Sequence, residues 1–376
     1  METNGKTACI FGANGVSGTA MIEALLKEPA SEWKSIIALS RRPLQGADFH
    51  NDNRLHSLSA DLLETDVDTL SDQLSKVNGH EITHVYFYAY IEKQDEKELV
   101  NVNRELLKRA LDVIVKTVQA EKNHGSFQSF ALQTGYKYYG VHKGALYIAS
   151  RPFQEDAKRH SGSNFYYDQE DLLKEYATKY NFSYLITRPN GNYMNAAVSL
   201  AIYCCIRQEL NESLAFPGAK SIRKCLSDWS TAANNAEFQL WASIHSKNEI
   251  FNIHDGTPIK YSELWHAITE YFDPNSKQQD PKKQDECLPI TLVEYMKDKR
   301  DVWQRLAQKH QLDPMAFDYA TWHFVDFVFG RYHYIFGDVT GDLSRARKLG
   351  WTKTYSTVNG FYETFDKLKQ LNIIPK

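Results

Sequence analysis

The chain has 376 residues, 24% of them charged, and a formal net charge of −3. This length exceeds what one hydrophobic core usually serves, so we expect one large domain and a smaller region partly interleaved with it. The near-neutral charge provides no basic field that would concentrate the protein on nucleic acid or an anionic membrane, and we expect neither partner.

The sequence also shows no signal for a membrane or a metal. Its longest apolar run, residues 196–206, is about half of what a membrane span requires, and the N-terminus lacks a secretory pattern, so we expect a cytoplasmic protein. Five scattered cysteines without a Cys-x-x-Cys pair, and 13 histidines without paired spacing, predict reduced thiols and no metal site.

The first half of the chain alternates short β-rich runs with helical periodicity. A long apolar stripe from Glu96 to Lys122 predicts a crossover helix between the fourth and fifth runs. This rhythm predicts an α/β fold, a Rossmann-type doubly wound parallel sheet. The predicted strands are 7–13, 35–41, 55–60, 84–90, 127–134 and 183–187.

The second half mixes helical patterns with irregular stretches. After a polar stretch at 140–163, helices are predicted from near Phe165 and at 195–207, 231–244 and 261–271. Residues 273–286, rich in Lys, Gln, Asp and Pro, predict a surface loop or a disordered segment. The aromatic stretch 322–336 suits core packing or the wall of an apolar pocket, and the general abundance of aromatic residues in cores favours the first.

A glycine-rich turn follows the first strand and opens a helix predicted around residues 21–26. Its Gly-x-x-Gly-x-x-Gly spacing, typical of extended short-chain dehydrogenases, allows close approach of the backbone to a pyrophosphate at a helix N-terminus. An ordinary strand-to-helix turn is the alternative, and the strand and helix on either side argue against it. We predict cofactor contacts from Gly12, Asn14, Gly15, Val16 and Gly18.

The second strand ends in Ser40-Arg41-Arg42, where an NAD enzyme normally has an acidic residue. Two guanidinium groups match the 2′-phosphate of NADPH, so NADPH is the predicted cofactor; a solvated basic pair is the alternative. Ends of other strands complete the predicted cofactor site: Asp61, Leu62, Thr134, Gly135, Arg188 and Pro189. We therefore predict an NADP-binding domain over 1–194, with segments near 225–255 interleaved, and a mainly helical substrate-binding region over 195–376.

A tyrosine with a lysine four residues later would suit proton transfer to a substrate oxygen. Tyr139 and Lys143 have this spacing, but they follow the fifth strand too closely and lack a helical pattern. Tyr166 lies where the catalytic helix is expected, and Glu170 stands four residues after it. Lys137, at the end of the fifth strand, is the best candidate for the missing positive charge, because ligands bind at the carboxyl ends of such strands.

Two segments resemble those of the progesterone 5β-reductase/iridoid synthase-like (PRISE) family of extended short-chain dehydrogenases/reductases. They are Thr134-Gly135-Tyr136-Lys137-Tyr138-Tyr139 and Asn164-Phe165-Tyr166-Tyr167-Asp168-Gln169-Glu170-Asp171. The resemblance extends over nearly the whole chain. It implies NADPH-dependent reduction of a C=C bond conjugated to a carbonyl in a small apolar enone or enal, with Tyr166 holding the enolate oxygen and Lys137 adding charge.

The chain departs from the family pattern at positions that line the pocket in relatives, here Tyr90, Tyr138 and His142. A steroid or monoterpene dialdehyde substrate therefore does not follow from the resemblance. Three alternatives remain: a carbonyl reductase, a non-reductive isomerase or cyclase of natural-product biosynthesis, and a non-catalytic NADP-binding protein. The expected partner is a small-molecule substrate, and a homodimer is left open.

Overall fold

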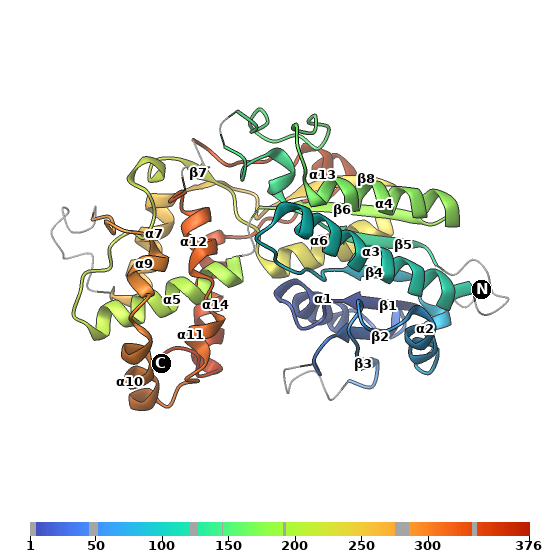
Figure 1. The fold of residues 1–376 in the computed structure, drawn as a ribbon, viewed down its shortest axis with the longest axis horizontal. Coiled ribbons are helices and arrows are strands. Elements are labelled where there is room, and N and C mark those ends of the chain that lie inside the picture. The colour runs from blue at the N-terminus through green and yellow to red at the C-terminus, as the bar shows by residue number, and fades with distance from the viewer. Residues whose placement is uncertain are drawn as a thin grey trace.

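A seven-stranded parallel sheet forms the centre of the larger domain (Figure 1). The computed structural model describes residues 5–44, 52–119, 127–144, 146–190, 193–274, 286–332 and 337–376. The strand order is β3-β2-β1-β4-β5-β6-β8, so the chain winds outwards from β1 in both directions, as in the doubly wound Rossmann fold. The strands are β1 (Lys6–Phe11), β2 (Trp33–Ser40), β3 (Leu55–Ser59), β4 (His84–Phe87), β5 (Ser129–Gln133), β6 (Ser183–Pro189) and β8 (Glu249–Ile253).

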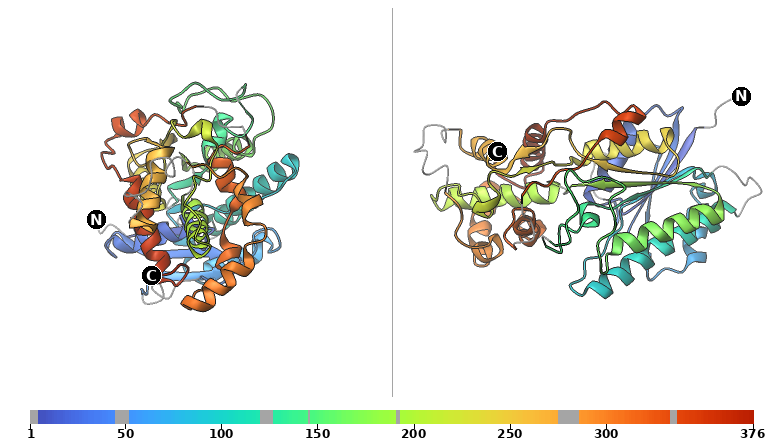
Figure 2. Two further views of the ribbon diagram at one scale, coloured as in Figure 1. Left: turned by 90° about the vertical axis from the view of Figure 1, so that its left-hand side faces the viewer. Right: turned by 90° about the horizontal axis from the view of Figure 1, so that it is seen from above.

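Helices cover both faces of this sheet. In β1, Ala8 and Ile10 join one hydrophobic cluster and Cys9 and Phe11 join the other, because successive side chains of a strand point to opposite faces. The right-hand view of Figure 2 separates the yellow helix α6 from α3 and α4 across the sheet. On one face lie α1 (Val16–Lys27), α6 (Ala232–His245) and α13 (Ser344–Leu349); on the other lie α2 (Val67–Ser75), α3 (Glu96–Gln119) and α4 (Phe165–Tyr180).

A second, mainly helical region has its own hydrophobic core, built around the buried face of α5. This region lies on the left of Figure 1. A separate two-stranded antiparallel sheet consists of β7 (Leu226–Ser227) and β9 (Ile259–Lys260). The helices of the second region are α5 (Tyr193–Glu209), α7 (Tyr261–Phe272), α9 (Leu292–Met296), α10 (Arg300–His310), α11 (Ala316–Tyr319), α12 (Trp322–Val328) and α14 (Thr357–Gln370). Short 3-10 turns occur at η2 (Gly79–Glu81), η3 (Tyr136–Tyr139) and η4 (Lys220–Ile222).

The predicted α/β Rossmann fold is confirmed, with two differences in detail. The first helix begins at Val16, directly after Gly15, whereas the apolar pattern predicted it around residues 21–26. A seventh strand, β8, pairs with β6 from within the segment 225–255. This strand was not predicted, since an isolated run of five residues carries little periodicity.

Four predicted segments lie partly outside the described residues: 120–122 of the crossover helix, 145 of the polar stretch, 275–285 of the loop and 333–336 of the aromatic stretch. The described part of that stretch contributes Val325 and Phe329 to the core of the helical region, while Phe327 packs against the cluster around Tyr136 and Tyr139. Among the described helices, none is both long and apolar enough to span a bilayer.

Candidate active site

The glycine turn between β1 and α1 is built for close approach of a ligand to the backbone. Gly12 has φ +82°, which favours glycine, and a Cβ on Gly18 would lie 2.3 Å from the Gly12 carbonyl oxygen. Gly15 is the N-cap of α1 and has no side chain that could cap the first backbone N–H groups of that helix. These N–H groups and the positive end of the helix dipole suit the pyrophosphate of a dinucleotide.

Asn14 ties this turn to the loop after β2. Its Nδ2 donates to Ser40 Oγ at 3.1 Å, to the Arg42 carbonyl at 2.9 Å and to the Pro43 carbonyl at 3.0 Å. The exposed side chains of Arg41 and Arg42 therefore start from a loop that is anchored beside the glycine turn. The predicted basic pair and the predicted turn lie next to each other.

The loop after β3 holds the predicted cofactor residues Asp61 and Leu62. Asp61 Oδ1 accepts from the backbone N–H of Leu63 at 2.9 Å, a contact within its own turn. Leu62 is 5% exposed and packs in the core between the sheet and α3. Its side chain belongs to the core, so only its backbone could face a cofactor.

A chain of hydrogen-bonded polar side chains, which we did not predict, links the first turn of α1 to the end of β5. Gln133, the last residue of β5, donates to Ser17 Oγ at 2.9 Å, and Gln239 donates to Gln133 at 2.9 Å. Tyr88 in turn donates to Gln239 Oε1 at 2.7 Å. A local sequence pattern cannot reveal this chain of hydrogen bonds, because its four residues come from four separate segments.

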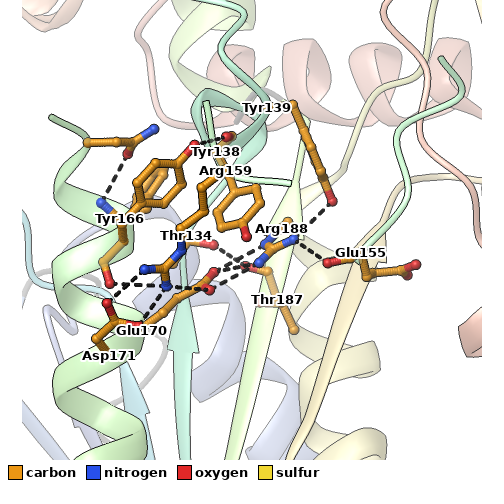
Figure 3. A network of polar contacts seen from close by, with 12 residues as sticks. Thr134, Tyr138, Tyr139, Glu155, Arg159, Tyr166, Glu170, Asp171, Thr187 and Arg188 are labelled. Atoms are coloured by element: carbon orange, nitrogen blue, oxygen red, sulfur yellow. Dashed lines mark hydrogen bonds and ion pairs between the residues drawn. The ribbon is translucent and has the colours of Figure 1, made fainter. Parts of the chain in front are cut away.

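The end of β5 brings the predicted catalytic tyrosine to the predicted lysine segment. Thr134 donates through both its backbone N–H and its hydroxyl to the Thr187 carbonyl, which holds β5 against β6 (Figure 3). A Cβ on the next residue, Gly135, would lie 3.2 Å from the Tyr166 hydroxyl and 3.3 Å from the Pro189 carbonyl oxygen. The absent side chain thus leaves room for that hydroxyl, two residues before Lys137.

Lys137 lies in the single turn η3 between buried tyrosines. The Tyr136 hydroxyl donates to Asp228 at 3.1 Å, and that of Tyr139 donates to Asn252 at 2.5 Å. No hydrogen bond or ion pair joins the Lys137 ammonium group to any residue in the described ranges. The turn is fixed by its neighbours, and the charged end of Lys137 is left available.

Tyr166 lies in the first turn of α4. Burial raises the pKa of its phenol, and the negative charge of Glu92 raises it further. The phenol is therefore protonated throughout the neutral pH range. A protonated tyrosine at this position can donate a hydrogen bond to an oxygen that becomes negative.

Only one of the three predicted pocket residues, Tyr90, is exposed beside Tyr166. The centre of the Tyr90 ring lies 5.6 Å from that of Phe165, and the centre of the Phe165 ring lies 4.1 Å from that of Tyr166. The Tyr90 hydroxyl donates to Glu92. Tyr138 is 6% exposed, with the Arg188 guanidinium 3.3 Å from its ring centre, so it is part of the interior. Burial, and then the charge of Lys137, lower the pKa of His142 to about 3, so this imidazole is neutral.

The guanidinium of Arg188 is wholly buried and does not face the cofactor site as we predicted. It donates to both oxygens of Glu170, at 2.9 and 3.0 Å, and to the Glu155 carbonyl at 3.0 Å (Figure 3). The Tyr138 ring covers one side of it. An isolated arginine has an unfavourable transfer to the interior, so the carboxylate of Glu170 is its required partner.

Tyr139 and Lys143, which have the spacing of a tyrosine–lysine pair, make contacts with different partners. The Tyr139 hydroxyl is held by Asn252 and Arg188, and its ring stacks on Phe153 with centres 4.6 Å apart. Lys143 forms an ion pair with Glu96 at 3.2 Å. The hydrogen bonds of Tyr139 and the ion pair of Lys143 thus hold the two side chains in separate places. Across the described ranges, no three His, Cys, Asp or Glu side chains converge to hold a metal.

Comparison with known proteins assigns the chain to a family with this type of fold. A family model described as a PRISE-like Rossmann-fold domain matches residues 8–375. The chain belongs to the PRISE family. Its predicted membership is confirmed, and with it an enzyme of the short-chain dehydrogenase/reductase type, an oxidoreductase class whose solved neighbours bind nicotinamide dinucleotides.

Two relatives and one solved structure illustrate the likeness. The chain is 31% identical to the short chain dehydrogenase gsfE of Penicillium aethiopicum, covering 99% of this chain and 100% of that one. It is 29% identical to the (S)-8-oxocitronellyl enol synthase CYC2 of Camptotheca acuminata, covering 98% and 93%. The Bordetella bronchiseptica enzyme WbmG, solved in complex with NAD, superposes with a TM-score of 0.63 at 12% identity, covering 99% and 96%, which shows the shared fold.

The buried pair gives a first testable prediction. Arg188→Met should lower the free energy of unfolding by about 3–5 kcal/mol, because it removes the bidentate partner of the buried Glu170 carboxylate and leaves only Arg159 and Lys174, each 3.9 Å away. Arg109→Met, which breaks a half-exposed ion pair with Glu105 on α3, should cost at most about 0.5 kcal/mol. Urea unfolding followed by circular dichroism measures both.

The double variant Arg188→Met/Glu170→Met separates a stranded charge from lost packing. The double variant should be more stable than Arg188→Met alone, since the buried Glu170 carboxylate that lost its bidentate partner is also removed. If the double variant were no more stable, the cost would come from packing and the ion-pair explanation would be wrong.

Proposed function

We propose that this PRISE-family enzyme is an NADPH-dependent reductase of an activated C=C bond in a small, largely apolar enone or enal. The observation that carries the proposal is the Tyr166 hydroxyl over Gly135, at the carboxyl edge of the sheet and beside the turn that bears Lys137. The name of the Camptotheca relative, an enol synthase, supports it. An enol is what remains when hydride adds to the β-carbon of an enal and the oxygen takes a proton.

The cofactor proposal rests on the fit of the chain's own residues. The glycine turn would hold the pyrophosphate, and the anchored Arg41 and Arg42 would bind the 2′-phosphate that distinguishes NADPH from NADH. NADPH, when bound, supplies a hydride. The chain must then stabilise the charge that appears on the substrate oxygen.

Tyr166 and Lys137 share that task in the proposed reaction. As the β-carbon gains hydride, the electron pair of the C=C bond moves toward the carbonyl and leaves negative charge on its oxygen. The protonated Tyr166 hydroxyl donates a hydrogen bond to this oxygen, which is commonly worth about 3 kcal/mol in the transition state. The Lys137 ammonium group would add positive charge nearby. The enolate then takes one proton, from the Tyr166 hydroxyl or from solvent, and the product leaves as the enol or its saturated carbonyl tautomer.

A carbonyl reductase or a non-reductive isomerase or cyclase could use the same tyrosine. These reactions are compatible with the site because the half-buried Tyr166 is a protonated donor, which serves tautomerisation as well as reduction. Product analysis separates them, because only the proposed reaction adds two hydrogens across the C=C bond.

We therefore expect NADPH oxidation with enones or enals and little with matched saturated ketones, and a product heavier by two hydrogens at the C=C bond by mass spectrometry. Tyr166→Phe should lower kcat about 100-fold, because one transition-state donor is lost, while the Kd for NADPH stays nearly the same. Steady-state kinetics and fluorescence titration of NADPH measure these quantities.

A fully active Tyr166→Phe enzyme would exclude Tyr166 as the donor. NADPH binding without oxidation over the whole panel would contradict the reductase and favour a non-reductive role. Tyr203→Phe, which removes a buried hydroxyl in the helical region, is the matched control and should keep its kcat.

The basic loop makes a second prediction. Arg41→Ala/Arg42→Ala should reduce the preference for NADPH over NADH about 100-fold, given about 1.5 kcal/mol for each charge-assisted hydrogen bond to the 2′-phosphate. The ratio of kcat/KM for the two cofactors measures it. Arg104→Ala, at an exposed position on α3, should leave that ratio unchanged; an unaltered ratio in the double variant would mean that the phosphate is recognised elsewhere.

A third prediction concerns pH. The negative charge of Glu92 opposes ionisation of Tyr166 and raises its pKa, so Glu92→Gln should lower that pKa. Because the proposed donor must be protonated, the alkaline loss of kcat/KM should begin at a lower pH in this variant. Glu98→Gln, which also removes an acidic charge near the start of α3, is the control; an equal shift in both variants would mean a general charge effect.

A further inference from the structure

The side chain of Asn164 contacts both segments that carry the proposed catalytic residues. It is 1% exposed and is the N-cap of α4: its Oδ1 accepts from the Tyr166 backbone N–H at 3.1 Å. Its Nδ2 donates to the Lys137 carbonyl at 2.8 Å. One carboxamide therefore joins the backbones of Lys137 and Tyr166.

The second hydrogen of the Asn164 amide is also used. Nδ2 lies 3.1 Å from His160 Nε2, and the other ring nitrogen of His160 lies 2.9 Å from the Ser161 carbonyl. The ring therefore has its proton on Nδ1 and accepts at Nε2. This contact fixes which end of the Asn164 amide faces Lys137.

Tyr167 makes a second link between the same two segments. Its hydroxyl donates to the Tyr138 carbonyl at 2.8 Å and accepts from the His160 backbone N–H at 3.0 Å. Asn164 and Tyr167 thus bind the carbonyls of successive residues of η3. Two side chains from the first turn of α4 hold one short turn at two adjacent points.

This double link matters because it joins the turn that bears Lys137 directly to the start of the helix that bears Tyr166. The Lys137 ammonium group has no partner in the described ranges, and the Tyr166 hydroxyl lies over Gly135, which has no side chain to restrain it. The lysine chain is long and flexible, so its reach depends on where the η3 backbone is held. Displacements near 1 Å can cost about 100-fold in rate.

We propose that Asn164 and Tyr167 are positioning residues, which fix Lys137 relative to Tyr166 and thereby determine kcat without contacting substrate or cofactor. The inference rests on the proposed function for the roles of Tyr166 and Lys137. It gives a physical reason for two further residues of the segment Asn164-Phe165-Tyr166-Tyr167.

The test uses substitutions that keep the fold of α4. Asn164→Ser retains a good N-cap, but its side chain is too short to reach the Lys137 carbonyl as well. Tyr167→Phe keeps the ring and removes only the donor. Each should lower kcat about tenfold, with KM for the enone and Kd for NADPH within about twofold of the wild-type values.

Matched controls lie in the helical region. Ser356→Ala removes the N-cap of α14, and Tyr203→Phe removes a buried hydroxyl that donates to a carbonyl at 2.8 Å. Both should keep kcat, which separates positioning from a general loss of stability. An equal fall of kcat in the controls would overturn the proposal.

A double-mutant cycle shows whether Asn164 acts through Lys137. If it does, Asn164→Ser should lower kcat about tenfold in the wild type but less than twofold in a Lys137→Met background, since the positioned group is already absent. A full tenfold loss in that background would overturn the proposal.

Hydrogen exchange by mass spectrometry provides a readout independent of turnover. Asn164→Ser and Tyr167→Phe should both increase exchange at the amides of η3, whereas the two controls should not. Unchanged exchange would overturn the positioning claim. If the wild-type enzyme reduced no enone, the proposed function would fail, and the exchange result would still decide whether these residues hold the turn.

Discussion

The buried ion pair of Arg188 and Glu170 is the contact on which the geometry of the candidate site depends. Arg188 comes from β6 and Glu170 from α4, so the pair fastens the helix that carries Tyr166 onto the sheet. The same guanidinium binds the Glu155 carbonyl and packs on the ring of Tyr138. Four segments thus meet at one charge that must be neutralised in the interior.

This pair also explains why the tyrosine and the lysine cannot share one helix here. The position four residues after Tyr166, where a lysine on the same helix face would stand, is Glu170. A lysine at that position would bring a second positive charge against the buried Arg188 and leave it without its carboxylate. In the proposed reaction the positive charge has to come from another element, and Lys137 of η3, at the end of the neighbouring strand β5, is the residue that we propose for it.

The loop between β4 and α3 places polar side chains beside Tyr166. The half-exposed Tyr90 and the exposed Glu92 form a polar pair beside Phe165 and Tyr166. Tyr138, by contrast, is covered by Arg188 and faces the interior, so the variation at this position acts on packing.

Local patterns in the sequence were sufficient for the fold and for the chemistry of single segments. Alternating strands and helices, the glycine turn, the basic residues after β2 and the two tyrosine-rich segments are each contained within a short stretch, and six of the seven strands follow from them. What such patterns cannot contain is the direction in which a side chain faces once distant segments meet.

Only the tertiary structure decided that Arg188 faces inward to Glu170, that the side chain of Leu62 packs in the core, and that β8 extends the sheet beyond β6. It likewise decided that Asn164 and Tyr167 bind successive carbonyls of η3. The physical reason is the same in each case: the partner of a buried polar group, or the neighbour of an edge strand, comes from a part of the chain far away in the sequence.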